Sequence, residues 1–301
     1  MSAPPALLLD TFSLFFRAFF ALPPMNTERG EPTNALYGFS VLLLKLLREQ
    51  PGAELCFALD TGRATFRKRE FLPYKAQREP APTPLVEQLR RLDQLLEAVG
   101  APVLGSPGFE ADDVVATVAA ELRREGRPAL VVSGDRDLLQ LAHGSVKVHF
   151  VGARGKQAAT YDEAAVRERF GVPPWRLPSF VALVGDPSDN LPGVPGIGPG
   201  TASKLLRERE NVEQLLSDAA SLKPPRLGPL LLEHAEQIRR TERLARLRCD
   251  APLPQPPHLA APSRARLEAL RAVFETLEFK SLLPRLDKLA ALAPSLLDSG
   301  V

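Results

Sequence analysis

Three apolar runs of this chain each lead into an aspartate, and this spacing could build an acidic site. The runs cover residues 6–9 before Asp10, 55–59 before Asp60 and 130–134 before Asp135. Short apolar runs bounded by polar residues predict buried strands of a parallel sheet. In an open α/β sheet the ligand site lies at the carboxyl ends of the strands. Carboxylates gathered there repel one another, so the pattern favours bound divalent cations with oxygen ligands, Mg²⁺ or Mn²⁺.

More acids join this set further along the chain. They are Glu110, Asp112 and Asp113 at the start of a predicted helix, Asp137 just after the third run, and Asp186 and Asp189 in a polar turn. Each group has an ordinary alternative, because strand-end aspartates are often solvated and acids in a first turn complement the helix dipole. Asp-Pro and Asp-Asn pairs also favour turns. Their occurrence together in one chain of 301 residues points to a shared metal site.

A basic segment lies between two of the acidic groups. Residues 61–80 contain six basic residues and two acids. Arg67, Lys75 and Arg78 could neutralise phosphates, and Tyr74 could offer a stacking face to an unpaired base. A solvated charged surface is the ordinary alternative for each of these residues.

A glycine-rich motif occupies residues 191–206. It does not fit a dinucleotide-binding loop, because that loop follows a strand and this motif follows a polar turn. A hairpin between two helices fits better, with Pro199 in the first turn of the second helix. Gly193, Gly196 and Gly198 allow a tight turn, and the backbone N–H groups of the second helix favour a phosphate. An ordinary connection between helices is the alternative.

The elements that must position these residues change in type along the chain. Up to about residue 150, strands alternate with helices, which predicts an α/β fold with a twisted, mostly parallel sheet flanked by helices. Helices are expected at 35–49, 85–99 and 111–125, then at 161–170, 176–184, 199–209, 228–247 and 264–283. The pattern predicts an α/β core over residues 1–175, a helical part over 176–292 and a tail over 293–301.

Composition argues against disulfide-rich, secreted and membrane-spanning proteins. The chain is 45% hydrophobic with a formal net charge of +2, so it can bury a core and shows little overall charge bias. Its two cysteines are too few for a disulfide framework. The sequence shows no signal peptide and no apolar run long enough for a membrane span. A cytoplasmic protein without a membrane partner is expected.

Taken together, the motifs resemble the 5′-nuclease family. The resemblance is strongest to the 5′→3′ exonuclease domain of bacterial family A DNA polymerases and its stand-alone relatives, and weaker to flap endonucleases. It covers nearly the whole chain, through residues 8–10 with Arg17, 57–60, 66–67, 74–78, 108–113, 133–137, 185–190, 193–206, 277–279 and 281–283.

The resemblance implies roles for the acids and for the basic segment. It assigns a first metal site to Asp10, Asp60, Glu110 and Asp112, and a second to Asp135, Asp137 and Asp186. Asp112 would bridge the two ions, with Asp113 and Asp189 in support. Lys75 and Arg78 would hold the scissile phosphate, Tyr74 would stack on the 5′ nucleotide, and Arg17 would contact a nearby phosphate.

The resemblance also implies how DNA is held. Residues 176–292 would form a DNA-binding subdomain whose helix-hairpin-helix element grips the duplex and binds K⁺. Its expected contacts are Gly193, Gly196, Gly198, Thr201 and Lys204.

The implied function is a monomeric, structure-specific 5′ nuclease that uses two metal ions. It would act as an exonuclease and a flap endonuclease on branched or 5′-flap DNA, nicked duplex and RNA–DNA hybrid, in replication and repair at the nucleoid. Two other functions remain open from the residues: a non-catalytic protein that binds branched DNA, and a single-strand ribonuclease on a similar acidic core.

Overall fold

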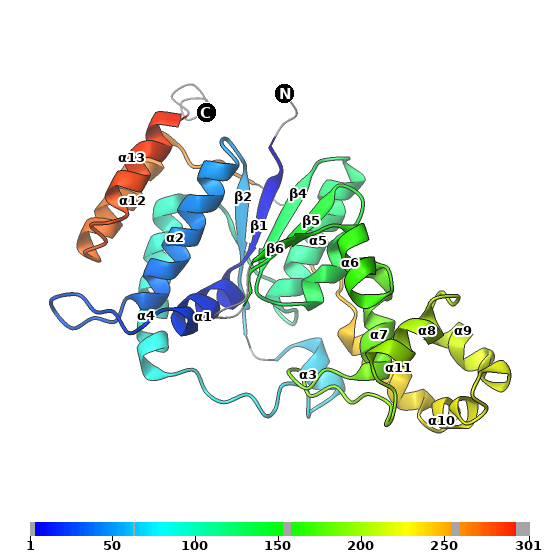
Figure 1. Cartoon of the computed structure of the whole chain (residues 1–301). Helices are drawn as coiled ribbons and strands as arrows, with labels where there is room; N and C mark the ends of the chain where they lie inside the picture. The colour runs from blue at the N-terminus through cyan, green and yellow to red at the C-terminus, as the bar shows by residue number, and fades with distance from the viewer. Residues whose placement is uncertain (1–3, 63, 153–157, 254–258, 293–301) are drawn as a thin grey trace.

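In the described residues, a sheet of six strands is formed by the first half of the chain, and a mainly helical half follows it (Figure 1). The computed structural model describes residues 4–62, 64–152, 158–253 and 259–292, so the expected tail at 293–301 lies outside the described residues. The strand order is β3-β2-β1-β4-β5-β6. Neighbours from β3 to β5 are parallel, and β6 pairs antiparallel with β5. The predicted α/β class with a mostly parallel sheet is confirmed.

The strands are short, and three of them, β1, β2 and β4, coincide with the apolar runs of the sequence. The six strands are β1 Ala6–Asp10, β2 Leu55–Ala58, β3 Val103–Leu104, β4 Ala129–Ser133, β5 Val146–Phe150 and β6 Ala159–Tyr161. The sequence did not predict β3 or β6, because strands of two and three residues without buried runs leave no periodic signal.

The central strand β1 is buried on both faces. Leu8 belongs to an apolar cluster with Val115 and Val118 of α5 (Ala111–Arg124). Leu7 and Leu9 belong to a second cluster, which includes residues of α2 (Asn34–Glu49) and α4 (Thr83–Val99). Successive side chains of a strand point to opposite faces, so a continuous apolar run is what a sheet covered by helices on both sides requires.

The other helices complete the two halves. In the first half they are α1 Thr11–Ala21 and α3 Phe66–Glu70. In the helical half they are α6 Glu163–Phe170, α7 Leu177–Val184, α8 Pro199–Leu206, α9 Val212–Ser217, α10 Leu227–Glu233 and α11 Ala235–Ala245. The last two are α12 Arg264–Thr276 and α13 Leu283–Leu292.

Two expected helices are each divided in the structure. The helix predicted at 228–247 ends at His234 and restarts as α11, and the one predicted at 264–283 ends before Glu278, whose φ of 60° is left-handed. Leu270 and Phe274 of α12 join the second cluster, and Figure 1 shows α12 and α13 beside α2 and α4. The apolar faces of α12 and α13 therefore pack on the core beside the sheet, and the expected subdomain over residues 176–292 stays a prediction.

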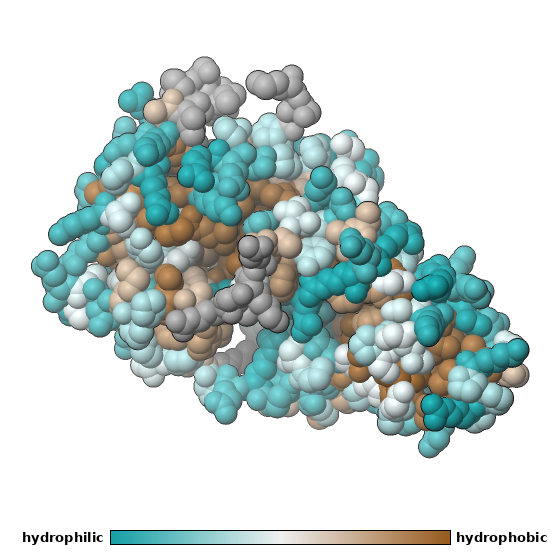
Figure 2. All heavy atoms as spheres, viewed as in Figure 1, coloured by the Kyte–Doolittle hydropathy of each residue, from teal (hydrophilic) through white to brown (hydrophobic). Residues whose placement is uncertain are grey.

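The surface of the described residues is mainly hydrophilic in the view of Figure 2. Hydrophobic residues show between hydrophilic ones over both the sheet half and the helical half. Within the described ranges, none of the helices has the length and apolar character that a membrane crossing requires.

Candidate active site

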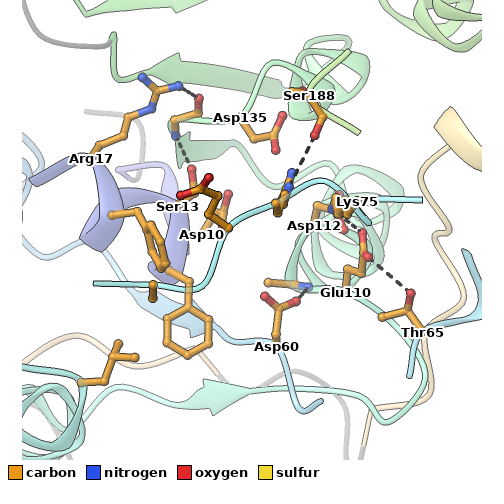
Figure 3. Close-up of a pocket in the computed structure, with 18 of the residues that line it drawn as sticks. Asp10, Ser13, Arg17, Asp60, Thr65, Lys75, Glu110, Asp112, Asp135 and Ser188 are labelled. Atoms are coloured by element: carbon orange, nitrogen blue, oxygen red, sulfur yellow. Dashed lines mark hydrogen bonds and ion pairs between the residues drawn. The ribbon is translucent and has the colours of Figure 1, made fainter. Parts of the chain in front are cut away.

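The three strand-end aspartates meet in one cavity at the carboxyl edge of the sheet (Figure 3). Asp10 is the last residue of β1 and lies opposite Ala58 of β2 in the strand register. Asp60 and Asp135 each follow their strand by two residues. The chain order reverses beside β1, where β2 and β4 flank it, and this position opens a crevice in α/β sheets. The cavity has a volume of about 1250 Å³.

The first turn of α5 adds two acids to this cavity. Glu110 immediately precedes the helix, and Asp112 lies in its first turn. The backbone N–H of Ala111 donates to Asp60 Oδ1 at 2.8 Å, which ties the end of β2 to the start of the helix. Unpaired N–H groups and the helix dipole make this terminus a favourable place for negative charge.

Burial makes the ionised form of several acids costly. The pKa of Asp10 is raised to about 7, chiefly by burial; the hydrogen bond from Ser133 opposes this shift, and the carboxylates of Asp135 and Asp60 contribute to it. Burial and the carboxylate of Asp113 hold the pKa of Asp112 well above its usual range. The pKa of Asp137 is raised by burial and by the carboxylates of Asp135, Asp189 and Asp186. The ionised forms of these three acids are therefore disfavoured, and a bound cation would offset that cost.

Two cations of the chain pair with acids at the edge of the cavity. Lys75 Nζ lies 2.9 Å from Glu110 Oε2 and 3.6 Å from Asp189 Oδ2. Arg78 Nη2 lies 2.7 Å from Asp189 Oδ1. Burial raises the pKa of Glu110, but Lys75 and Arg67 lower it by more, so it ends below the ordinary value. Unlike Asp10 and Asp112, Glu110 is held ionised by the protein itself.

The backbone brings these cations to the acids. Lys75 has a left-handed φ of 53°, and its N–H donates to the carbonyl of Asp189 at 3.0 Å. The Asn190 side chain donates to the carbonyl of Pro73 at 2.8 Å. The basic segment is therefore docked on the polar turn at 186–190, although more than a hundred residues separate them.

The second group of expected acids lies beside the first. Asp137 opens the short 3₁₀ helix Asp137–Leu141, and its N–H donates to Asp135 Oδ1 at 2.9 Å. Asp186 Oδ1 accepts from the N–H and the hydroxyl of Ser188 at 2.8 and 2.7 Å. Asp189 is 4% exposed, and Lys75 and Arg78 pair with it.

The carboxylate oxygens of this site suit a hard cation, but the acidic side chains do not converge on one metal position. Every acid near the cavity offers carboxylate oxygens, which Mg²⁺ and Mn²⁺ prefer. Among the described residues, no three His, Cys, Asp or Glu side chains converge closely enough to hold a metal ion. The acids lie apart for two physical reasons. Carboxylates without a bound cation repel one another, and two of them, Glu110 and Asp189, form ion pairs with Lys75 and Arg78 instead.

Three residues of the expected site are held by contacts within the protein. Asp113 is 0% exposed, and both of its oxygens accept from the guanidinium of Arg67 at 2.6 and 2.8 Å; its expected support of the metal site stays a prediction. Arg67 is 1% exposed and cannot reach DNA. Tyr74 lines the cavity but is 2% exposed, and its hydroxyl lies 2.9 Å from Glu110 and 2.8 Å from Asp189; its expected stacking on a nucleotide stays a prediction.

Several hydroxyl groups that the sequence analysis did not assign to the site hold its acids and backbone. Ser133 Oγ donates to Asp10 Oδ2 at 2.5 Å, and Thr65 Oγ1 donates to Glu110 Oε1 at 3.4 Å. Ser13 Oγ accepts from the N–H of Gly134 at 3.1 Å. Arg17 donates to the Gly134 carbonyl, and its guanidinium lies 5.3 Å from the centre of the Phe150 ring. The available signal was position, since Ser13 and Ser133 lie within a few residues of strand-end aspartates.

The glycine-rich motif forms a hairpin between α7 and α8. A Cβ at Gly193 would lie 2.3 Å from the carbonyl carbon of Val184, so close backbone packing requires this glycine, whereas the sequence analysis assigned it to DNA contact. Gly196 has a left-handed φ of 79°, which favours glycine. Gly198 is exposed and precedes α8, and a Cβ there would meet nothing within 4 Å.

The two polar side chains expected in the hairpin lie on α8. Thr201 is half-buried and Lys204 is exposed. The hairpin is separate from the acidic cavity, because none of these residues is among those that line it.

Comparison with known families gives two matches that together span most of the chain. Residues 5–171 match the N-terminal resolvase-like domain of 5′-3′ exonucleases. Residues 172–266 match the C-terminal SAM fold of 5′-3′ exonucleases.

The matched relatives are longer than this chain. DNA polymerase I of Mycobacterium bovis is 39% identical over 300 residues, which cover 99% of this chain and 33% of that protein. The thermostable DNA polymerase I of Thermus thermophilus is 40% identical, with 96% of this chain and 34% of that protein covered. The chain thus spans about a third of the length of these relatives.

A solved structure shares the fold. It is the flap endonuclease of bacteriophage T5 in a pseudo-enzyme-product complex with DNA and metal ions. The TM-score is 0.66 at 21% identity, and the match covers 97% of this chain and 99% of that one.

Proposed function

The chain belongs to the 5′-3′ exonuclease family, and we propose that it is a structure-specific 5′ nuclease that hydrolyses phosphodiester bonds with two divalent cations. The observation that carries this proposal is the excess of buried carboxylates at the reversal point of the sheet. Burial holds the pKa of Asp10 at about 7 and that of Asp112 well above its usual range. Keeping such groups ionised is costly, and bound cations would offset that cost.

The acids divide into two ligand groups. Asp10, Asp60, Glu110 and Asp112 would hold one Mg²⁺ or Mn²⁺, and Asp135, Asp137 and Asp186 the other, with Asp112 between them. Asp189 supports the second group through its pairs with Lys75 and Arg78. Bound ions of this kind supply an activated water and stabilise the leaving oxygen of an in-line displacement.

Lys75 and Arg78 would bind the reacting phosphate. In the free chain they pair with Glu110 and Asp189 at the edge of the cavity. A cation loaded onto those carboxylates would weaken these pairs, and the two side chains could then donate to phosphate oxygens. Arg17, which lines the same cavity, would contact a neighbouring phosphate.

The hairpin would hold the duplex away from the cut. Its exposed residues Gly196, Gly198 and Lys204 present backbone groups and one cation, which suits phosphate contacts without base readout. Backbone carbonyls of the same turn would bind K⁺. The substrates that fit are 5′-flap and other branched DNA, nicked duplex and RNA–DNA hybrid, bound by a monomer at the nucleoid in replication and repair.

A cleavage assay tests the proposal. A 5′-flap DNA should be cut in Mg²⁺ and left intact in EDTA, while free single-stranded RNA should be cut far more slowly. Binding of flap DNA without any cleavage would indicate the non-catalytic alternative. Faster cleavage of free RNA would indicate a ribonuclease.

A further inference from the structure

Arg67 is a buried charge that the proposed chemistry does not use. Among the described residues that are less than 2% exposed, Arg67 has the largest volume. Its guanidinium makes two bonds to Asp113, at 2.6 and 2.8 Å, and lies 3.4 Å from Glu110 Oε2. It also donates from Nε to the carbonyl of Leu244 at 2.7 Å and from Nη2 to that of Arg246 at 3.2 Å. All of its donor positions therefore serve contacts within the protein.

These contacts join three parts of the chain that lie far apart in sequence. Arg67 lies on α3, at the base of the basic segment. Asp113 lies in the first turn of α5, which presents Glu110 and Asp112 to the cavity. The carbonyls of Leu244 and Arg246 lie at the C-terminal end of α11. The acids, the basic segment and the helical half thus meet at one guanidinium.

Asp113 accepts further hydrogen bonds from two backbone N–H groups. One of its oxygens accepts from the N–H of Arg248 at 2.9 Å, just beyond α11. The other accepts from the N–H of Glu110 at 3.1 Å. A displacement of α11 would therefore reach Glu110, a proposed metal ligand, through Asp113.

Helix α11 is also hydrogen-bonded to the hairpin between α7 and α8. The side chain of Gln237 on α11 donates to the carbonyl of Gly193 at 2.8 Å, and Thr241 Oγ1 donates to that of Pro192 at 3.2 Å. The hairpin, α11 and the Arg67–Asp113 pair form one continuous set of hydrogen bonds that ends at Glu110. Such a path carries coupling only where it biases the arrangement of a site at each end.

We infer that Arg67 and Asp113 are a positioning pair that sets Glu110 and Asp112 for metal binding and couples this arrangement to duplex bound by the helical half. The inference rests on the proposed function, since it presumes a metal site at these acids and a duplex site at the hairpin. It assigns no contact with metal or DNA to either residue. Groups that orient metal ligands commonly alter metal affinity when they are replaced.

A purely structural ion pair is the competing explanation. Removing one partner alone would leave a buried charge unpaired and destabilise the fold, which would not discriminate. Arg67→Met combined with Asp113→Leu removes both charges and leaves apolar groups in the buried space, which a fold can tolerate. A second variant, Arg67→Lys, keeps the charge but loses the two-pronged contact.

The matched control is the pair of Arg91 and Glu31. Arg91 also makes two bonds to one carboxylate, at 2.6 and 3.2 Å, and neither residue lines the cavity. Arg91→Met with Glu31→Leu removes a partly exposed pair of similar geometry at α4, which packs on the opposite face of the sheet from α5.

The measurement is Mn²⁺ affinity by electron paramagnetic resonance, for the chain alone and with a nicked duplex that cannot be cleaved. In the parent, duplex should raise Mn²⁺ affinity. In Arg67→Met/Asp113→Leu, Mn²⁺ should bind about tenfold more weakly, and duplex should no longer change it. Arg67→Lys should give a smaller loss, and the control pair should behave like the parent.

Three outcomes would overturn either the inference or the proposed function on which it rests. A folded double variant with parental Mn²⁺ affinity and an undiminished response to duplex would show that the pair serves only the fold. If the double variant does not fold, the same parental behaviour in Arg67→Lys would overturn the inference. A parent chain that binds no Mn²⁺ would instead overturn the proposed function.

Discussion

The acidic cavity and the glycine hairpin place their polar groups in opposite ways. The cavity buries carboxylates beside one another, so that the pKa of Asp10 rises to about 7. The hairpin exposes Gly196 and Gly198 and keeps a bare backbone at its surface. Buried, mutually repelling charge is costly to maintain and suits catalysis, whereas an exposed backbone costs little and suits binding of phosphates. The contrast indicates that chemistry and duplex affinity occupy separate regions.

Removing one carboxylate from the cavity should give the largest effect. Asp112→Asn should lower the single-turnover cleavage rate by about 10³-fold, because metal-ion stabilisation is worth several kcal/mol. Flap binding should persist, since the hairpin is unchanged, and Asp93→Asn on the exposed face of α4 is the control. Full activity of Asp112→Asn in Mg²⁺ would falsify the bridging role of Asp112.

Lys75 and Arg78 test the boundary between chemistry and binding. Lys75→Ala and Arg78→Ala should each lower the single-turnover rate by about 10²-fold at saturating enzyme, as expected for a lost donor to a reacting phosphate. DNA affinity should change much less. Arg69→Ala in the same segment, outside the cavity lining, is the control. Weaker affinity with an unchanged rate would make both residues ordinary phosphate contacts.

The burial of Asp10 predicts how stability depends on pH in the absence of metal. Because its folded pKa of about 7 exceeds its ordinary value of 3.8, Asp10 contributes stability that is complete below about pH 4 and is lost as the pH rises through about 7. Between about pH 5.5 and 7.5 the loss should be about 2 kcal/mol.

Denaturant unfolding in EDTA measures this loss. Asp10→Asn should flatten the profile, and Mg²⁺ should restore stability more at the higher pH. A parent profile that stays flat in EDTA would contradict the assigned burial.

The hairpin should give the smallest effect, and an effect on affinity alone. Gly198→Val has open space in the free chain, so the fold should be unaffected. The added side chain would obstruct a phosphate, which should weaken duplex binding about tenfold and flatten its salt dependence. Gly193→Ala should instead destabilise the fold, because its Cβ would overlap Val184. Unchanged flap affinity and salt slope in Gly198→Val would leave the hairpin as a connection between helices.

The sequence predicted the parts of the site that depend on local pattern. The runs before Asp10, Asp60 and Asp135 are apolar enough to require strands buried on both faces, and their carboxyl ends must then lie at one edge. Helical spacing after Glu110 likewise fixed the start of α5. Divisions of helices were missed at His234 and Glu278, because a break that tertiary packing imposes leaves the apolar periodicity intact.

Tertiary structure alone decided which charged residues face the cavity. Arg67 and Asp113 have the same residue types as Arg78 and Asp112. Arg78 and Asp112 line the cavity, whereas Arg67 and Asp113 are buried away from it. A one-residue step around the first turn of α5 turns Asp112 into the cavity and Asp113 toward Arg67. The sequence determined that acids and cations would gather at one edge of the sheet. Which of these residues face the cavity and which form contacts within the protein depended on how α11 and the turn at 186–190 pack against them. Contacts between segments distant in sequence leave no local pattern from which they could be predicted.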